Sequence, residues 1–219
     1  MTNQVIASAK TLFSAYREAL KGLEAGLGSN FSKTVDLMKS STGHVVVCGM
    51  GKSGIIGRKI SATLASTGTP SLFLHPAEAI HGDLGMVRRG DIVLLISYSG
   101  STEEIVRLLP AFKRLDARLI AMTGNPSSVI AISAEISLDI SVDREACPLN
   151  LAPTTSSLNS LVLGDAIAVA LMEARGFQES DFANTHPGGA LGRRLLTRVR
   201  DKMRSQNLPF VDTTASVQD

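Results

Sequence analysis

At residues 44–54 the chain reads HVVVCGMGKSG, an unbroken apolar run that leads into a glycine-rich turn and the start of a helix. The same arrangement returns at residues 91–102, where an apolar run is followed by the serine-rich stretch SYSGST. Further apolar runs lie at residues 71–74, 118–122 and 135–140. Unbroken aliphatic runs indicate strands that are covered on both faces. With helical segments between them, they predict a doubly wound α/β fold around a mainly five-stranded parallel sheet flanked by helices.

Two helices are predicted before the first strand. Residues 2–27 place apolar side chains at helical spacing, and after two glycines a second helix is expected over residues 29–40. Residues 157–173 are apolar nearly all round, which predicts a helix inside the assembly or at a subunit contact. Asp165 within it is expected to be structural and hydrogen-bonded to a neighbouring loop.

The composition excludes several classes of protein. Of the 219 residues 44% are hydrophobic and 4% aromatic, which predicts an aliphatic core. The formal net charge of +2 is too small to indicate a nucleic-acid or membrane partner. Cys48 and Cys147 show neither CxxC nor metal-ligand spacing, so we expect no disulfide and no metal site. We see no signal peptide and no apolar stretch long enough to span a bilayer, so a cytoplasmic location is expected.

The composition changes near the end of the chain. Residues 193–204 carry six basic side chains against one acidic one. We interpret this stretch as a solvated linker rather than a nucleic-acid patch, because it is short and has no aromatic residue to stack on a base. Residues 1–204 are predicted to form one domain, and residues 205–219 a tail or the start of a further module.

The glycine-rich turn at residues 49–54 matches GxGxxG after a strand, which alone is a weak sign of a dinucleotide site. Such a site also needs an acidic residue near the end of the second strand, and residues 71–76 contain none. A P-loop has the pattern GxxxxGK[ST]. It is excluded because, with Gly51-Lys52-Ser53 as its end, the position of the first glycine is occupied by Val46. Neither nucleotide interpretation is favoured.

The serine-rich loop is more informative. Hydroxyls at Ser97, Ser99, Ser101 and Thr102 lie at the junction of a strand and a helix, where backbone amides also face outward. Together they can surround a phosphate group. The alternative is a serine-rich turn with a single helix cap. A third hydroxyl cluster at residues 154–157 is either simple capping or another wall of the same site.

Five polar side chains near the loop ends could carry chemistry: Lys52, His81, Glu104, Glu145 and His186. Each also has a plainer interpretation. Lys52 can be an exposed residue at the start of a helix. Glu104 can simply stabilise its own helix, because a carboxylate in the first turn interacts favourably with the helix dipole. Glu145 can form a surface salt bridge with Arg144. The two histidines lie in loop-like sequence, which favours a functional role.

Five segments together resemble the SIS (sugar isomerase) domain family, and specifically its arabinose-5-phosphate isomerase branch. They are residues 47–54, 75–85, 97–104, 152–157 and 186–192, and the similarity extends over about residues 10–204. The serine loop alone is typical of any SIS fold, which is flavodoxin-like. The segments around His81 and His186, with residues 152–157, are more specific to this branch.

The resemblance implies an enzyme that interconverts D-ribulose 5-phosphate and D-arabinose 5-phosphate through an enediol, without a cofactor. Its product would supply synthesis of Kdo, a sugar of lipopolysaccharide and of some capsules. It implies a catalytic group of Lys52, Glu104, Glu145, His186 and His81. The implied substrate-binding residues are Gly51, Ser53, Ser97, Ser99, Ser101, Thr102, Thr154, Thr155 and Ser156.

The individual roles are hypotheses. We assign proton transfer to Glu145 or Glu104, ring opening to His186, and stabilisation of the developing oxyanion to Lys52. The resemblance also implies a homo-oligomer, a dimer or tetramer, with sites near the subunit interfaces. Many relatives carry a pair of CBS (cystathionine-β-synthase) modules after the SIS domain, and residues 199–209 resemble the opening of one.

Three rival functions remain open. A non-catalytic SIS module could bind a sugar phosphate for regulation, but it would not need the lysine, Glu145 and both histidines. An isomerase of another sugar phosphate would use the same loops. A dinucleotide-binding reductase is disfavoured by the missing ribose carboxylate.

Overall fold

The computed structural model describes residues 2–204, 206, 210 and 213–216. The chain divides into two compact units after Phe177, and the first unit holds the whole sheet. Most of residues 205–219, the predicted tail, lie outside the described residues. The domain boundary predicted at residue 204 therefore stays a prediction.

One parallel sheet forms the centre of the first unit, with its strands in the order β2-β1-β3-β4-β5. The strands are β1 (Val45–Gly49), β2 (Ser71–Leu74), β3 (Ile92–Ile96), β4 (Arg118–Thr123) and β5 (Ile136–Asp139). The predicted fold class is confirmed. Strand β2 lies on one side of β1, and β3, β4 and β5 follow on the other side, so the strand order reverses between β1 and β3. In open α/β sheets ligands bind at the carboxyl ends of the strands at such a switch point.

Helices alternate with the strands, as predicted. They are α1 (Thr2–Ala25), α2 (Ser29–Ser40), α3 (Gly51–Ser66), α4 (Pro76–Ile80), α5 (Glu103–Arg114), α6 (Val129–Ser133) and α7 (Thr155–Arg175), with the 3-10 turn η1 (Asp83–Met86). Both predicted N-terminal helices are confirmed. The sequence did not predict α4 or α6, because five residues are too few to show a helical period.

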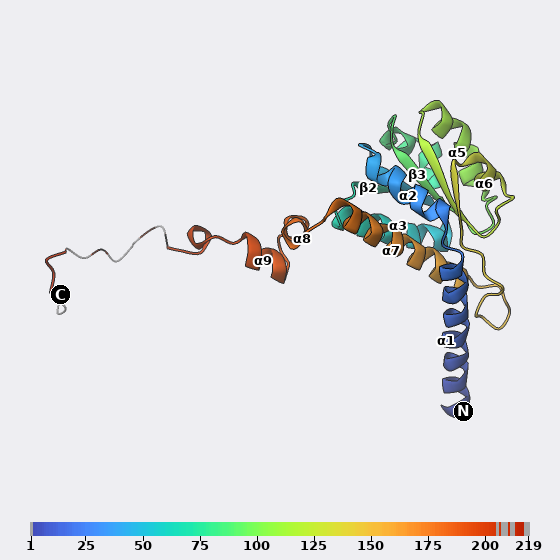
Figure 1. Cartoon of the computed structure of the whole chain (residues 1–219), viewed down its shortest axis with the longest axis horizontal. Coiled ribbons are helices and arrows are strands. Elements are labelled where there is room, and N and C mark those ends of the chain that lie inside the picture. Colours follow the sequence, from blue (N-terminus) through green and yellow to red (C-terminus); the bar gives the residue numbers. More distant parts are fainter. Residues whose placement is uncertain (1, 205, 207–209, 211–212, 217–219) are drawn as a thin grey trace. The chain divides into compact units, whose positions relative to one another are not determined.

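Side chains alternate across the sheet and build one apolar core on each face. Val45 and Val47 of β1 belong to the core covered by α2, α3 and α7. Val46 and Cys48 belong to the opposite core, which α4, α5 and α6 cover. Figure 1 shows α2, α3 and α7 on one side of the sheet and α5 and α6 on the other. Burial on both faces explains why the strands read as unbroken apolar runs.

Helix α7 packs against α1, α2 and α3. The expectation that no apolar stretch is long enough to span a bilayer was wrong: among the described residues α7 is the one helix long and apolar enough to cross a membrane. Half of it is buried in the unit, as in a core helix. A Cβ at Gly164 would lie 2.4 Å from the side chain of Ile60, so glycine allows α3 and α7 to approach closely. Asp165 pairs with Lys59 of α3, and the expected hydrogen bond to a loop was wrong.

The second unit, from Gln178 onward, contains α8 (Glu179–Thr185), α9 (Ala190–Leu196) and the 3-10 turn η2 (Val199–Asp201). Helices α8 and α9 pack on each other. A Cβ at Gly192 would lie 2.1 Å from the carbonyl oxygen of His186, so this packing depends on glycine. Helix α9 includes residues 193–196, so the linker interpretation was wrong for them.

Asp91 fixes the amino end of the sheet. Its side chain is buried, with 1% exposed, and its Oδ1 accepts a hydrogen bond from the backbone N–H of His44 at 2.8 Å. Its Oδ2 accepts one from the N–H of Arg88, also at 2.8 Å. The carboxylate therefore joins the residues that precede β1 to the turn that precedes β3.

Replacing Asp91 with Ala should lower the free energy of unfolding by about 1–3 kcal/mol, because two backbone donors lose a charged acceptor. Urea unfolding followed by circular dichroism would measure the change. Glu18→Ala is a suitable control, since Glu18 forms an exposed pair with Lys21 and its loss should cost less than about 0.5 kcal/mol. Equal stability of the Asp91 variant and the parent protein would contradict the assignment.

Candidate active site

The β1–α3 turn places Lys52 and Ser53 at the carboxyl end of β1. Gly51 has a φ of +57°, in the left-handed region that favours glycine. A Cβ at Gly54 would lie 2.7 Å from the carbonyl oxygen of Gly49, so the helix can start this close to the strand only with glycine there. These two requirements explain the GxGxxG match without a nucleotide. Lys52 is exposed in the first turn of α3.

The serine loop uses its hydroxyls in two different ways. Ser97 is buried; its Oγ lies 2.8 Å from Oγ1 of Thr102 and accepts a hydrogen bond from the N–H of Gly100. Ser99 and Ser101 are exposed, and their hydroxyls contact each other at 3.3 Å. Ser97 therefore shapes the loop from inside, while Ser99 and Ser101 face solvent beside the start of α5.

Gly100 sets the shape of this loop. Its φ is +65°, and a Cβ there would lie 1.9 Å from Oγ of Ser128. Its carbonyl oxygen accepts a hydrogen bond from the N–H of Ile130, at the start of α6. The loop is therefore held against the neighbouring β4–α6 connection.

Glu145 is buried and binds the start of α7. Its Oε2 accepts hydrogen bonds from the N–H groups of Thr154 and Thr155 at 2.7 Å each and from that of Ser156 at 3.3 Å. The hydroxyl of Thr154 donates to Oε2, and that of Ser156 to Oε1. The carboxylate thus satisfies amides that a helix N-terminus leaves without partners. The alternative of a surface salt bridge with Arg144 was wrong.

The surroundings of Glu145 favour its charged form. Burial raises the pKa of the carboxyl, but the hydrogen bonds from Ser156 and Thr154 outweigh burial and hold the pKa below its usual 4.5. General bases work best with a pKa near the working pH. In this conformation Glu145 is better suited to fix the site and carry negative charge than to take a proton from carbon.

A cavity of about 330 Å³ opens between these elements. It is lined by Met50, Lys52, Ser53, Tyr98, Glu145, Asn150, Leu151, Pro153, Ser156, Ser157 and Ser160. The cation of Lys52 and the carboxylate of Glu145 thus line one space, together with several hydroxyls. The predicted residues brought together here are Lys52, Ser53, Glu145 and Ser156.

Tyr98 and Asn150 line the cavity although the sequence did not single them out. The Tyr98 hydroxyl donates to the carbonyl of Val142 at 3.3 Å and accepts from its N–H at 3.2 Å. The amide oxygen of Asn150 accepts a hydrogen bond from the N–H of Glu145 at 2.6 Å. Tyr98 thus connects the serine loop to the segment that carries Glu145. The only sequence signal was the place of Tyr98 within SYSGST.

Several predicted residues do not line this cavity. Glu104 is half-buried in the first turn of α5, beside the serine loop, and no hydrogen-bond or ion-pair partner lies near it among the described residues. His81 is exposed at the carboxyl end of α4. Thr155 contributes its backbone N–H to Glu145, while its buried hydroxyl has no hydrogen-bond partner in the described part of the chain.

His186 belongs to the second unit, where it caps the carboxyl end of α8. Its Nδ1 lies 3.0 Å from the carbonyl oxygen of Phe182 and 3.0 Å from the hydroxyl of Thr185. Its ring stacks on that of Phe182, with 3.9 Å between the ring centroids. The imidazole is therefore held firmly by its own helix.

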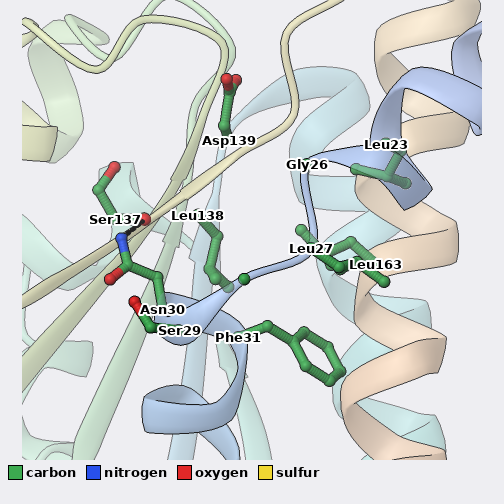
Figure 2. Close-up of a pocket in the computed structure, with 11 residues that line it drawn as sticks. Leu23, Gly26, Leu27, Ser29, Asn30, Phe31, Ser137, Leu138, Asp139 and Leu163 are labelled. Atoms are coloured by element: carbon green, nitrogen blue, oxygen red, sulfur yellow. Dashed lines mark hydrogen bonds between the residues drawn. The ribbon is translucent and has the colours of Figure 1, made fainter.

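A second hollow, of about 260 Å³, lies where α1 joins α2 (Figure 2). There the side-chain amide of Asn30 donates to the carbonyl of Ser137 at 2.9 Å, which fastens the start of α2 to β5. Asp139 of β5 also lines this hollow (Figure 2). Among the described residues that line it, the one charged side chain is the carboxylate of Asp139, which would repel a phosphate.

The sequence profile of the SIS domain family matches residues 38–170. The chain is 59% identical to arabinose 5-phosphate isomerase KdsD of Pseudomonas aeruginosa, over 94% of this chain and 64% of that protein. It is 51% identical to arabinose 5-phosphate isomerase GutQ of Escherichia coli K12, over 97% of this chain and 66% of that protein. The chain thus spans just under two thirds of the length of these curated relatives.

A solved structure of the E. coli CFT073 protein c3406, in complex with arabinose 5-phosphate, has a similar fold. Its TM-score is 0.83 and its sequence is 44% identical, with 85% of this chain and 100% of that chain covered. The similarity therefore extends over the whole of a chain that holds a sugar-phosphate ligand.

The hydrogen bonds of Glu145 predict a specific response to acid. Because its folded-state pKa is lowered, its stabilisation is present above the unfolded-state value of about 4.5 and is lost as pH falls through the folded-state pKa. Glu145→Gln should therefore be less stable than the parent protein at pH 7, by about 1.5–3 kcal/mol. The gap should narrow below pH 4.5.

Urea unfolding at a series of pH values from 7 to 3 would measure both effects. Glu103→Gln is the matched control, because Glu103 is an exposed carboxylate paired with Arg107 on the surface of α5. It should change stability little at any pH. A constant gap between the Glu145 variant and the parent protein across the series would contradict the lowered pKa.

Proposed function

The chain belongs to the SIS domain family, and from that premise we propose that it is an isomerase of D-arabinose 5-phosphate and D-ribulose 5-phosphate. One observation carries the proposal: Lys52 and Glu145 line one cavity beside the serine loop, at the switch point of the sheet. The names of the relatives, and the structural neighbour bound to arabinose 5-phosphate, support the choice of substrate.

We assign phosphate binding to the β3–α5 loop. The exposed hydroxyls of Ser99 and Ser101, with Thr102 and the first amides of α5, offer donors to a dianion. Ser97 supports them from inside the loop. Gly51, Ser53, Thr154, Thr155 and Ser156 complete the proposed substrate-binding set, with Ser53 and Ser156 lining the cavity directly.

The reaction moves a proton between two neighbouring carbons. A base takes the proton from C2 of the aldose, the C–H electrons form the C1=C2 bond, and O1 receives a proton to give the enediol. Return of a proton to C1, with loss of the O2 proton, gives the ketose. To Lys52 we assign the stabilisation of the negative charge that develops on oxygen.

Among the two carboxylates, we assign the base to Glu104. The hydrogen bonds that lower the pKa of Glu145 weaken it as a base, whereas Glu104 has no partner among the described residues and follows the phosphate loop directly. His186 would open the sugar ring, and His81 completes the proposed catalytic group. No metal or cofactor is required by this scheme. We further propose a cytoplasmic enzyme that supplies Kdo synthesis.

The first test is turnover of D-arabinose 5-phosphate, followed by the appearance of ketose. Lys52→Ala should lower kcat by about 10²–10³-fold, because the oxyanion loses its cation. Lys59→Ala is the matched control on the same helix, since Lys59 pairs with Asp165. It should retain kcat, and both variants should unfold near the temperature of the parent protein.

Two outcomes would contradict this proposal. Saturable binding of the sugar phosphate without turnover would favour a non-catalytic SIS module that regulates a partner. Turnover of a different sugar phosphate in preference to the arabinose compound would keep the chemistry and replace the substrate.

Glu104→Gln with unchanged kcat would remove that residue as the base and return the role to Glu145.

We also propose that the chain forms a homo-oligomer, a dimer or tetramer, with its sites near the subunit interfaces. The support is a set of exposed apolar side chains on three helices of the first unit. Val5, Ile6 and Phe13 of α1 are each about half exposed or more, as are Ile55 of α3 and Val169 of α7. Figure 1 shows the first turns of α1 extending away from the sheet.

Sedimentation equilibrium should give a mass of at least twice the 23.1 kDa of one chain. Phe13→Asp should weaken the association, because it places a charge in an apolar contact. Ile132→Asp on α6 is the control, since Ile132 is 75% exposed on the opposite face of the sheet and should leave the mass unchanged. A parent protein that sediments as one chain would disprove the proposal.

A further inference from the structure

Phe182 and His186 form a stacked pair within the second unit. Both belong to the α8 segment, one helical turn apart, so their side chains lie on the same face. The ring centroids are 3.9 Å apart and the ring planes differ by 13°. A nearly parallel contact at this distance fixes the plane of the imidazole, which a single hydrogen bond would not do.

The hydrogen bonds of His186 determine which ring nitrogen carries the proton. The carbonyl oxygen of Phe182, 3.0 Å from Nδ1, can only accept. The hydroxyl of Thr185 donates to the same carbonyl at 3.0 Å, so its oxygen is oriented to accept from Nδ1. Nδ1 is therefore the protonated nitrogen, and in the neutral ring Nε2 carries the lone pair.

We infer that Phe182 is a positioning residue that, through its ring and its carbonyl oxygen, holds His186 with Nε2 as the basic nitrogen. This inference rests on the proposed function, in which His186 opens the sugar ring. A histidine that only caps α8 would need the hydrogen bond to the carbonyl but not the stacked ring.

The proposed step balances without any further reactant. Nε2 takes the proton of the C1 hydroxyl, the O–H electrons form the C1=O bond, and the C1–O4 bond breaks with its electrons on O4. The imidazolium then returns its proton to O4, so the histidine ends as it began. The step requires the lone pair on Nε2 and a fixed ring plane, and the stacked pair supplies both.

The ring nitrogens can be read directly in ¹⁵N-labelled protein by long-range ¹H–¹⁵N correlation, with the His186 signals assigned by their loss in His186→Gln. In the neutral form, Nδ1 should show the shift of a protonated nitrogen and Nε2 that of an unprotonated one. The opposite pattern in the parent protein would overturn the inference, whatever the behaviour of any variant.

Turnover then tests the positioning role. Phe182→Leu keeps the backbone carbonyl but loses the flat contact, and it should give mixed tautomers and a kcat lower by about ten- to a hundredfold. KM should stay within about twofold, because the ring does not bind substrate. Phe182→Tyr keeps the stacked face and should retain both the tautomer and kcat.

These experiments distinguish a failure of the positioning role of Phe182 from a failure of the proposed isomerase function. If the parent protein turns over the sugar phosphate but Phe182→Leu retains kcat while folded, the positioning role is wrong and the isomerase stands. If the parent protein has no turnover at all, the proposed function and the catalytic use of His186 fall together. The nitrogen shifts would then still report the tautomer.

Discussion

The hydrogen bonds between Glu145 and the first turn of α7 determine how the candidate site is built. Helix α7 packs against three other helices, and its first turn forms one wall of the cavity. Five donors converge on one buried carboxylate, and its negative charge also suits the positive end of the helix dipole. One side chain that follows β5 therefore fastens the first turn of α7, while the packing of α7 on α3 holds the rest of the helix beside Lys52.

This arrangement separates two carboxylates by their surroundings. Glu145 is held ionised by donors that lower its pKa, which makes it a fixed negative charge in the cavity that Lys52 also lines. Glu104, in the first turn of α5 after the serine loop, has no such donors among the described residues, which is why we assign the base to it. Sites that move protons commonly give two similar groups different environments and hence different roles. The geometry supports such a division here.

The parts of the fold that the sequence predicted are those carried by local pattern. Apolar runs identified the strands, and the glycine and serine turns identified the loops at their carboxyl ends. The strand order was beyond this reasoning, because burial on both faces does not tell which strands are neighbours. Local sequence pattern also could not predict the contacts of Glu145. These contacts join residues that are separated by an irregular loop, in which Asn150 has a left-handed backbone conformation. Tyr98 was missed because its bond to Val142 crosses between two loops.

The serine loop suits a phosphate because it adds no permanent charge. Its inner hydroxyls, at Ser97 and Thr102, hydrogen-bond to each other and hold the backbone. Gly100 has no Cβ, which would collide with Ser128. The outer hydroxyls and helix amides are then neutral donors. A cation in this loop would compete with the neutral donors for the phosphate. It would also compete with Lys52 for the negative charge that forms during proton transfer. Lys52 is the one cation among the residues that line the cavity, so in the proposed scheme its field acts on the oxygen where charge develops.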